Sequence, residues 1–82
     1  MTEAEVYSNL TSVFREVFDD DTLQLTPETT ADDVDGWDSA AHVSLVVAAE
    51  MRFGLRFRTA ELESLHNVGE FAELIQSKLE SR

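Results

Sequence analysis

The sequence contains no cysteine, and its first residues include neither a basic segment nor a long apolar run. Without cysteine the chain can form neither disulfide bonds nor thiolate metal sites, and cysteine usage gives no information on its redox compartment. The opening residues, MTEAEVYSNL, argue against a signal peptide or a membrane span. We therefore expect a cytoplasmic protein.

Basic side chains are also scarce, since six Lys and Arg stand against seventeen Asp and Glu for a formal net charge of −11. Such a charge repels phosphate backbones and anionic lipid headgroups at long range. We therefore expect neither a nucleic-acid partner nor a membrane partner. A basic patch on another protein suits this charge better, because complementary charge raises encounter rates without demanding a large interface.

The length limits the chain to one small domain, because 82 residues are too few to build two hydrophobic cores. Hydrophobic residues make up 43% of the chain and include five Phe and one Trp, a composition typical of a folded globule. We therefore expect a single domain spanning residues 1–82, present as a monomer.

Apolar residues recur at intervals of three and four between residues 3 and 18, which predicts the first helix. The following stretch, residues 19–37, holds the only proline, several Thr and Asp and no helical period, so it is predicted to be a long loop. Leu23, Leu25 and Val34 are expected to attach this loop to the core.

A second helix is predicted to begin at Asp38 and Ser39, because either side chain can accept a hydrogen bond from a free backbone N–H. It runs to Phe53, and Gly54 is expected to end it in the left-handed conformation. A short extended link over residues 55–58 follows.

Two further helical segments complete the prediction. Thr59 is expected to cap a brief turn that ends at Leu65, and Asn67 is expected to cap a last helix that ends near Glu80. No strand periodicity is present. The sequence thus predicts an all-α fold, a small four-helix bundle of three main helices and one short helix.

An Asp-Ser pair stands where the long acidic loop meets the second predicted helix, in the segment Asp35-Gly36-Trp37-Asp38-Ser39-Ala40-Ala41-His42-Val43. This segment resembles the attachment motif of acyl and peptidyl carrier proteins, usually Gly-x-Asp-Ser-Leu. The continuation Glu50-Met51-Arg52-Phe53-Gly54 resembles their second helix, and the order of helices agrees with that family over nearly the whole chain. The resemblance implies an acyl-carrier-protein-like bundle that is not an enzyme. Such a protein carries thioester-bound intermediates in fatty acid, polyketide or related secondary-metabolite biosynthesis.

By this resemblance, Ser39 is the hydroxyl to which a phosphopantetheinyl transferase joins 4'-phosphopantetheine from coenzyme A through a phosphodiester. Ser39 is then a substrate, and the resemblance implies no catalytic residue and no bound metal. Asp38 matches the motif aspartate, which contributes to the Mg²⁺-dependent transfer step. The position suits the chemistry, because a helix N-terminus exposes the hydroxyl while its free N–H groups favour an anionic phosphate. Capping by Asp38 or Ser39 is compatible with this role.

The resemblance also implies partners: the transferase, an acyl- or aminoacyl-loading ligase, and downstream synthase or transferase enzymes. We expect them to dock on the exposed face of the second helix, at Ala40, His42, Ser44 and Arg52. Ala40 stands where Leu is common, and Ser44 stands where many fatty-acid carriers have an acid. We therefore expect a contact that depends less on charge. His42 is expected to face solvent, either as an ordinary surface residue or as a partner contact.

Several other residues allow two interpretations. Trp37 either anchors the helix start in the core, which we favour, or touches the arm. Arg52, Arg56 and Arg58 are interpreted as solvated charges rather than as a partner site. Core packing is likewise the default for the apolar residues that could instead line an acyl-chain cleft, namely Val43, Val46, Val47, Leu62 and Phe71.

Two other functions disagree with the sequence, and a third remains possible. Aligning Gly36 with the sixth position of a calcium loop puts Ala31 first and His42 twelfth, where carboxylates are needed. A Ser39–His42 hydrolase lacks the Gly-x-Ser-x-Gly elbow and the strand before it. A carrier-like interaction module that never bears an arm remains the alternative. Because the sequence starts at Met1 and ends soon after the last predicted helix, we expect a discrete carrier rather than a piece of a synthase.

Overall fold

The computed structural model describes residues 2–81, which form four α-helices and one 3-10 turn without any strand. The elements in chain order are α1 (Glu3–Phe18), η1 (Ala31–Asp33), α2 (Ser39–Phe53), α3 (Thr59–Glu63) and α4 (Val68–Glu80). This arrangement confirms the predicted all-α bundle of three main helices and one short helix. No helix in the described part of the chain is long and apolar enough to cross a membrane.

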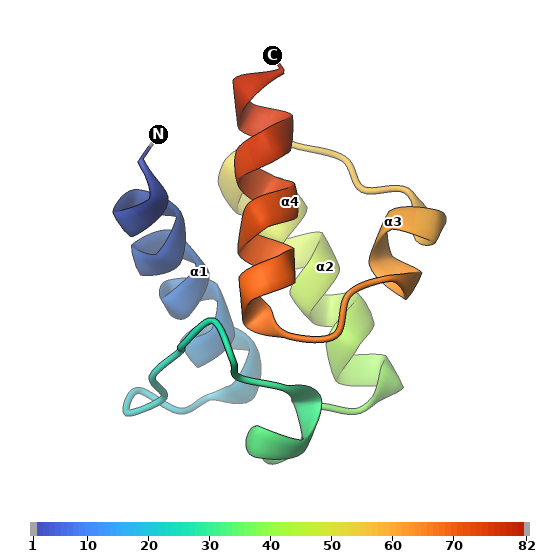
Figure 1. Ribbon diagram of the computed structural model, residues 1–82. Helices are drawn as coiled ribbons and strands as arrows, with labels where there is room; N and C mark the ends of the chain where they lie inside the picture. The colour runs from blue at the N-terminus through green and yellow to red at the C-terminus, as the bar shows by residue number, and fades with distance from the viewer. Residues whose placement is uncertain (1, 82) are drawn as a thin grey trace.

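The three long helices pack together, with α1 in contact with both α2 and α4. Figure 1 shows that α1 descends in the view while α2 and α4 both ascend, so the first residues of α2 and α4 lie at the same end of the bundle. The long loop and η1 close this end. The start of α2 therefore lies beside the loop and the link that precedes α4.

The core lies between the three long helices, each of which contributes one apolar stripe. Its fully buried members come from all three helices and include Val6, Leu10, Phe14, Leu45, Val68 and Ile75. Burying one such side chain stabilises the fold by about 1.5–3 kcal/mol. On α2 the buried positions are Leu45, Ala49 and Phe53, which recur every four residues and so mark one face of the helix.

The long loop is attached to the core as predicted. Val34 is buried, and Leu23 and Leu25 are partly buried against the core cluster. The loop also contains η1, which the sequence did not predict because three residues are too few to show a helical period. The side chain of Asp33 stabilises this turn by accepting a hydrogen bond from the Thr30 N–H at 2.9 Å.

Hydrogen bonds also join the loop to the start of α4. The Val68 N–H donates to the Thr29 carbonyl at 2.8 Å, and the Gly69 N–H donates to the Pro27 carbonyl at 2.9 Å. These bonds satisfy N–H groups that have no partner within the helix. The approach is so close that a Cβ on Gly69 would lie 2.8 Å from the Pro27 oxygen, which explains the glycine.

The helix ends agree with the sequence except at α3, which ends at Glu63 and not at Leu65 and has a different cap residue. Gly54 ends α2 in the left-handed conformation with φ of 67°, and the Asn67 side chain caps α4 by accepting from the Glu70 N–H at 2.9 Å. Thr59, however, is the first residue of α3 and not its cap. The cap residue is Arg58, whose N–H donates to the Glu61 carboxylate at 2.8 Å. This bond and the ion pair with Lys78 lower the pKa of Glu61.

Candidate functional site

The start of α2 is built around Asp38, which is the N-cap residue in an extended conformation. Its Oδ1 accepts a hydrogen bond from the Ala41 N–H at 2.8 Å, and its carbonyl accepts from the His42 N–H at 2.8 Å. Gly36, two residues earlier, has φ of 85°, a conformation that favours glycine, and its carbonyl accepts from the Asp38 N–H. The predicted helix start is thereby confirmed.

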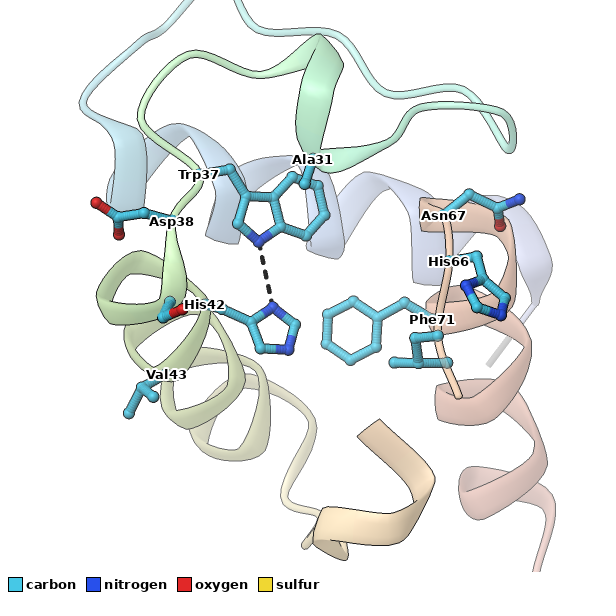
Figure 2. A pocket seen from close by; sticks show the side chains of 10 residues that line it. Ala31, Trp37, Asp38, His42, Val43, His66, Asn67 and Phe71 are labelled. Carbon is cyan, nitrogen blue, oxygen red and sulfur yellow. Dashed lines mark hydrogen bonds between the residues drawn. The ribbon is translucent and has the colours of Figure 1, made fainter. Parts of the chain in front are cut away.

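Ser39 is the first residue of α2 and is exposed. Within residues 2–81 its hydroxyl forms no hydrogen bond, and neither its own N–H nor that of Ala40 has a partner. The hydroxyl is thus accessible beside free helix N–H groups that favour an anion. Figure 2 shows the neighbouring Asp38 carboxylate pointing away from the adjacent cavity.

A cavity of about 590 Å³ lies beside Ser39. Its walls come from the end of the long loop, the first turn of α2, the link before α4 and α4 itself (Figure 2). The residues that line it include Trp37, Ser39, His42, Val43, Leu65 and Phe71. The cavity is mainly apolar and open to solvent, so it can receive an apolar or partly polar group.

Trp37 contacts both the core and the cavity. Its ring packs edge-on against Phe14 with centroids 5.2 Å apart, and it lies 6.1 Å from the ring of Phe18. Its Nε1–H donates to Nδ1 of His42 at 3.2 Å, and the Trp37 and His42 rings are stacked (Figure 2). The favoured interpretation of Trp37 as a core anchor is confirmed, and Trp37 also forms one wall of the cavity.

His42 does not face solvent as expected. It is half-buried, lines the cavity and accepts the hydrogen bond from Trp37. The reason is helical geometry, because His42 stands three residues before Leu45 and seven before Ala49 and so shares the buried face of α2. The sequence signal for this burial is the spacing from Leu45 and Ala49, which decides the orientation of His42 despite its polar side chain.

The predicted docking residues are therefore not all on one face. Ala40 and Ser44 are exposed on the outer face of α2, whereas His42 points inward. Arg52 is exposed at the other end of the helix, and its Nε donates to the Asn9 side chain of α1 at 2.9 Å. Ala40 and Ser44 thus share one exposed face of α2, and His42 and Arg52 lie apart from it.

The outer face of α2 carries large apolar side chains, two of which, Val43 and Val47, are predicted from the sequence to pack in the core. Val43 is 63% exposed, Val47 is 48% exposed and Met51 is 80% exposed. The default of core packing is therefore wrong for Val43 and Val47. It is right for Phe71, which is buried, while Val46 and Leu62 are half-buried. The missed signal is the four-residue spacing of these three residues, which places them opposite Leu45, Ala49 and Phe53.

Comparison with known proteins agrees with these features. Residues 8–75 match the family described as "Phosphopantetheine attachment site". The chain is 35% identical over 75 residues to the acyl carrier protein of Thermotoga maritima, covering 92% of this chain and 93% of that protein. It is 32% identical to acyl carrier protein 2 of Ralstonia nicotianae, covering 96% of this chain and 98% of that protein.

A solved structure gives the same result for the fold. The solution NMR structure of a holo acyl carrier protein from Geobacter metallireducens superposes with a TM-score of 0.88 at 45% sequence identity. The match covers 93% of this chain and 87% of that one. In the described residues, no group of three or more His, Asp or Glu is placed to hold a metal ion.

Proposed function

The chain belongs to the acyl carrier protein family, whose members bear a covalently attached phosphopantetheine and are not enzymes, and we propose that Ser39 is its attachment residue. The observation that carries this proposal is the accessible Ser39 hydroxyl at the first position of α2, within the Asp-Ser pair. Ser39 therefore serves as the substrate of a phosphopantetheinyl transferase.

The residues around Ser39 fit such a group. Its Oγ is free to form a phosphodiester with the phosphopantetheine phosphate of coenzyme A as adenosine 3',5'-bisphosphate leaves. The free N–H groups of Ser39 and Ala40 lie where they favour the phosphate charge. Once attached, the arm supplies a terminal thiol that holds acyl groups as thioesters. The chain's own part is to expose the hydroxyl and to present the arm.

Intact-mass measurement tests this proposal. After incubation with coenzyme A, Mg²⁺ and a broad-specificity transferase, the wild-type chain is expected to gain the mass of one phosphopantetheine. If the folded protein gains none with several transferases, the proposal fails and the alternative of an interaction module without an arm is favoured.

We further propose a single-domain, monomeric, cytoplasmic carrier that presents acyl intermediates in fatty acid, polyketide or related secondary-metabolite biosynthesis. One continuous core joining the three long helices supports the single domain. Its partners are the transferase, a loading ligase for acyl or aminoacyl groups, and the synthase or transferase enzymes that use the loaded arm. The family itself implies interaction with a transferase and with biosynthetic enzymes.

For docking we propose the outer apolar face of α2, made of Ala40, Val43, Ser44, Val47 and Met51. The proposed occupant is an apolar patch on the loading ligase, rimmed by basic side chains. The face begins beside Ser39 and contains no charged residue, whereas the chain as a whole has a net charge of −11. An apolar centre with a basic rim complements both features. This surface keeps Ala40 and Ser44 and replaces His42 and Arg52.

A charge placed on this face is expected to slow loading. Val47→Glu puts a carboxylate in the centre of the proposed contact, where its desolvation opposes docking. We expect kcat/KM for loading by the native ligase to fall by about tenfold or more, the size typical of a central interface residue. The helical circular-dichroism signal should be unchanged, because the side chain is half-exposed. Val47→Ile is the matched control, and equal loading of both variants would place the docking surface elsewhere.

Substitutions at Asp38 separate its capping role from its proposed role in transfer. Asn caps a helix about as well as Asp, so Asp38→Asn is expected to keep the melting temperature while slowing the Mg²⁺-dependent transfer. Asp38→Ala also loses the bond to Ala41 and should cost about 0.5–2 kcal/mol of stability. Transfer rates are measured by the gain in mass. A wild-type rate for Asp38→Asn would leave Asp38 with the capping role alone.

A further inference from the structure

The hydrogen bond between Trp37 and His42 fixes which imidazole nitrogen carries the proton. An indole N–H can only donate, so Nδ1 of His42, which accepts from it at 3.2 Å, has no proton. The neutral ring therefore carries its proton on Nε2. Trp37 is itself held by Phe14 and Phe18, so this arrangement is anchored in the core.

Nε2 of His42 has no hydrogen-bond partner among residues 2–81. Figure 2 shows the ring below that of Trp37 and beside that of Phe71, and His42 is one of the residues that line the cavity. The cavity walls are largely apolar and include Leu65 and Phe71. A hydrogen-bond donor is therefore presented within an apolar cavity, where any acceptor that enters gains a directed contact.

Other polar side chains that line the cavity are less suited to this task. His66 is exposed, and the Asn67 amide, whose Oδ1 caps α4, points away from the His42 ring (Figure 2). The Asp38 carboxylate can only accept, and it points away from the cavity (Figure 2). Among these side chains, His42 is thus the donor whose orientation is fixed, because its other ring nitrogen accepts the hydrogen bond from Trp37.

Ser39 lines the same cavity as His42. A flexible arm attached to Ser39 can fold back into this cavity, and the acceptors along its length beyond the phosphate include amide carbonyl oxygens. We propose that His42 is a positioning residue that donates from Nε2 to a carbonyl of the tethered group and so retains that group in the cavity beside α2. This inference rests on the proposed attachment at Ser39.

The accepting carbonyl can belong either to the arm or to the acyl group that the arm carries. Forms of the protein with different attached groups distinguish the two. The holo form offers only the amide carbonyls of the arm. A hexanoyl form adds the thioester carbonyl, and a 3-oxohexanoyl form adds a carbonyl on the cargo itself. The intact mass of each form is verified first, so failure to attach the arm is detected separately from failure of the contact.

Nitrogen-15 NMR of the imidazole rings tests the contact. The spectra are recorded at a pH high enough for imidazole to be neutral. The chain has two histidines, so His66 serves as an internal reference. We expect the Nε2 signal of His42 to shift in a loaded form relative to the apo protein, while His66 stays in place. A shift that is already present in the holo form assigns the acceptor to the arm, and a shift that first appears on acylation assigns it to the acyl group. If His42 is unchanged in every loaded form, the proposal is overturned.

Variants of His42 supply a second readout, the protection of the thioester against hydroxylamine relative to the same acyl-pantetheine free in solution. His42→Phe keeps an aromatic ring but cannot donate, and we expect protection to fall about fivefold, the effect of one hydrogen bond. His42→Gln can accept from Trp37 through its oxygen and donate through its nitrogen, so it should retain most of the protection. Both variants must show the wild-type helical signal. Equal protection in His42→Phe and the wild type would overturn the proposal.

Discussion

Ser39→Ala is expected to abolish the gain of one phosphopantetheine mass completely. The substitution removes the Oγ atom that forms the phosphodiester, and no neighbouring hydroxyl occupies the same place at the start of α2. It is not expected to disturb the fold, because the Ser39 hydroxyl makes no hydrogen bond within residues 2–81 and the helix is capped by Asp38. Exposed substitutions of this kind change stability by only about 0.5 kcal/mol.

The matched control for this experiment is Ser77→Ala on α4. Ser77 is also an exposed serine, but it lies in a helix interior, where it is not flanked by free backbone N–H groups. This control should gain the full mass. Mass spectrometry of the intact chain measures the gain in mass of both variants, and thermal melting followed by circular dichroism verifies their folds. If Ser39→Ala gains the same mass as the wild type, the attachment residue is another one.

The features that the sequence predicted are local ones. The stripe of Val6, Leu10 and Phe14 repeats with the helical period, and the cap at Asp38 and the stop at Gly54 depend on residue types within one turn. Such signals are set by near neighbours in the chain and need no knowledge of the rest of the fold. The position of Ser39 at a helix start is predictable for the same reason.

What the sequence did not predict depends on residues far apart in the chain. α2 is apolar on several sides, so the spacing separates the face of Leu45 from the face of Val43, but the sequence alone did not show which of the two is buried. That choice is made by the packing of α1 against one face of α2. The contact between Gly69 and Pro27 is likewise formed by loop closure and is absent from any local pattern.

Phe14→Ala is expected to have the largest effect on stability. The Phe14 side chain is completely buried, and its ring contacts those of Phe18 and Trp37. Truncating a buried Phe to Ala typically costs about 3–5 kcal/mol, because apolar contacts are lost and a cavity remains. For a small domain this is a large share of the free energy of unfolding, which is about 5–15 kcal/mol in total. Urea unfolding followed by circular dichroism measures the change.

The same substitution should reach the functional site, because Phe14 supports the ring of Trp37 from the core side while Trp37 holds His42 on the cavity side. We therefore expect the indole N–H signal of Trp37 to broaden or shift in NMR spectra of Phe14→Ala at low temperature, where the variant is folded. Met51→Ala is the control, since it also truncates a large apolar side chain, but one that is 80% exposed on α2. Its unfolding free energy should change by only about 0.5 kcal/mol. Equal losses in the two variants would contradict the assignment of Phe14 to the core beneath the site.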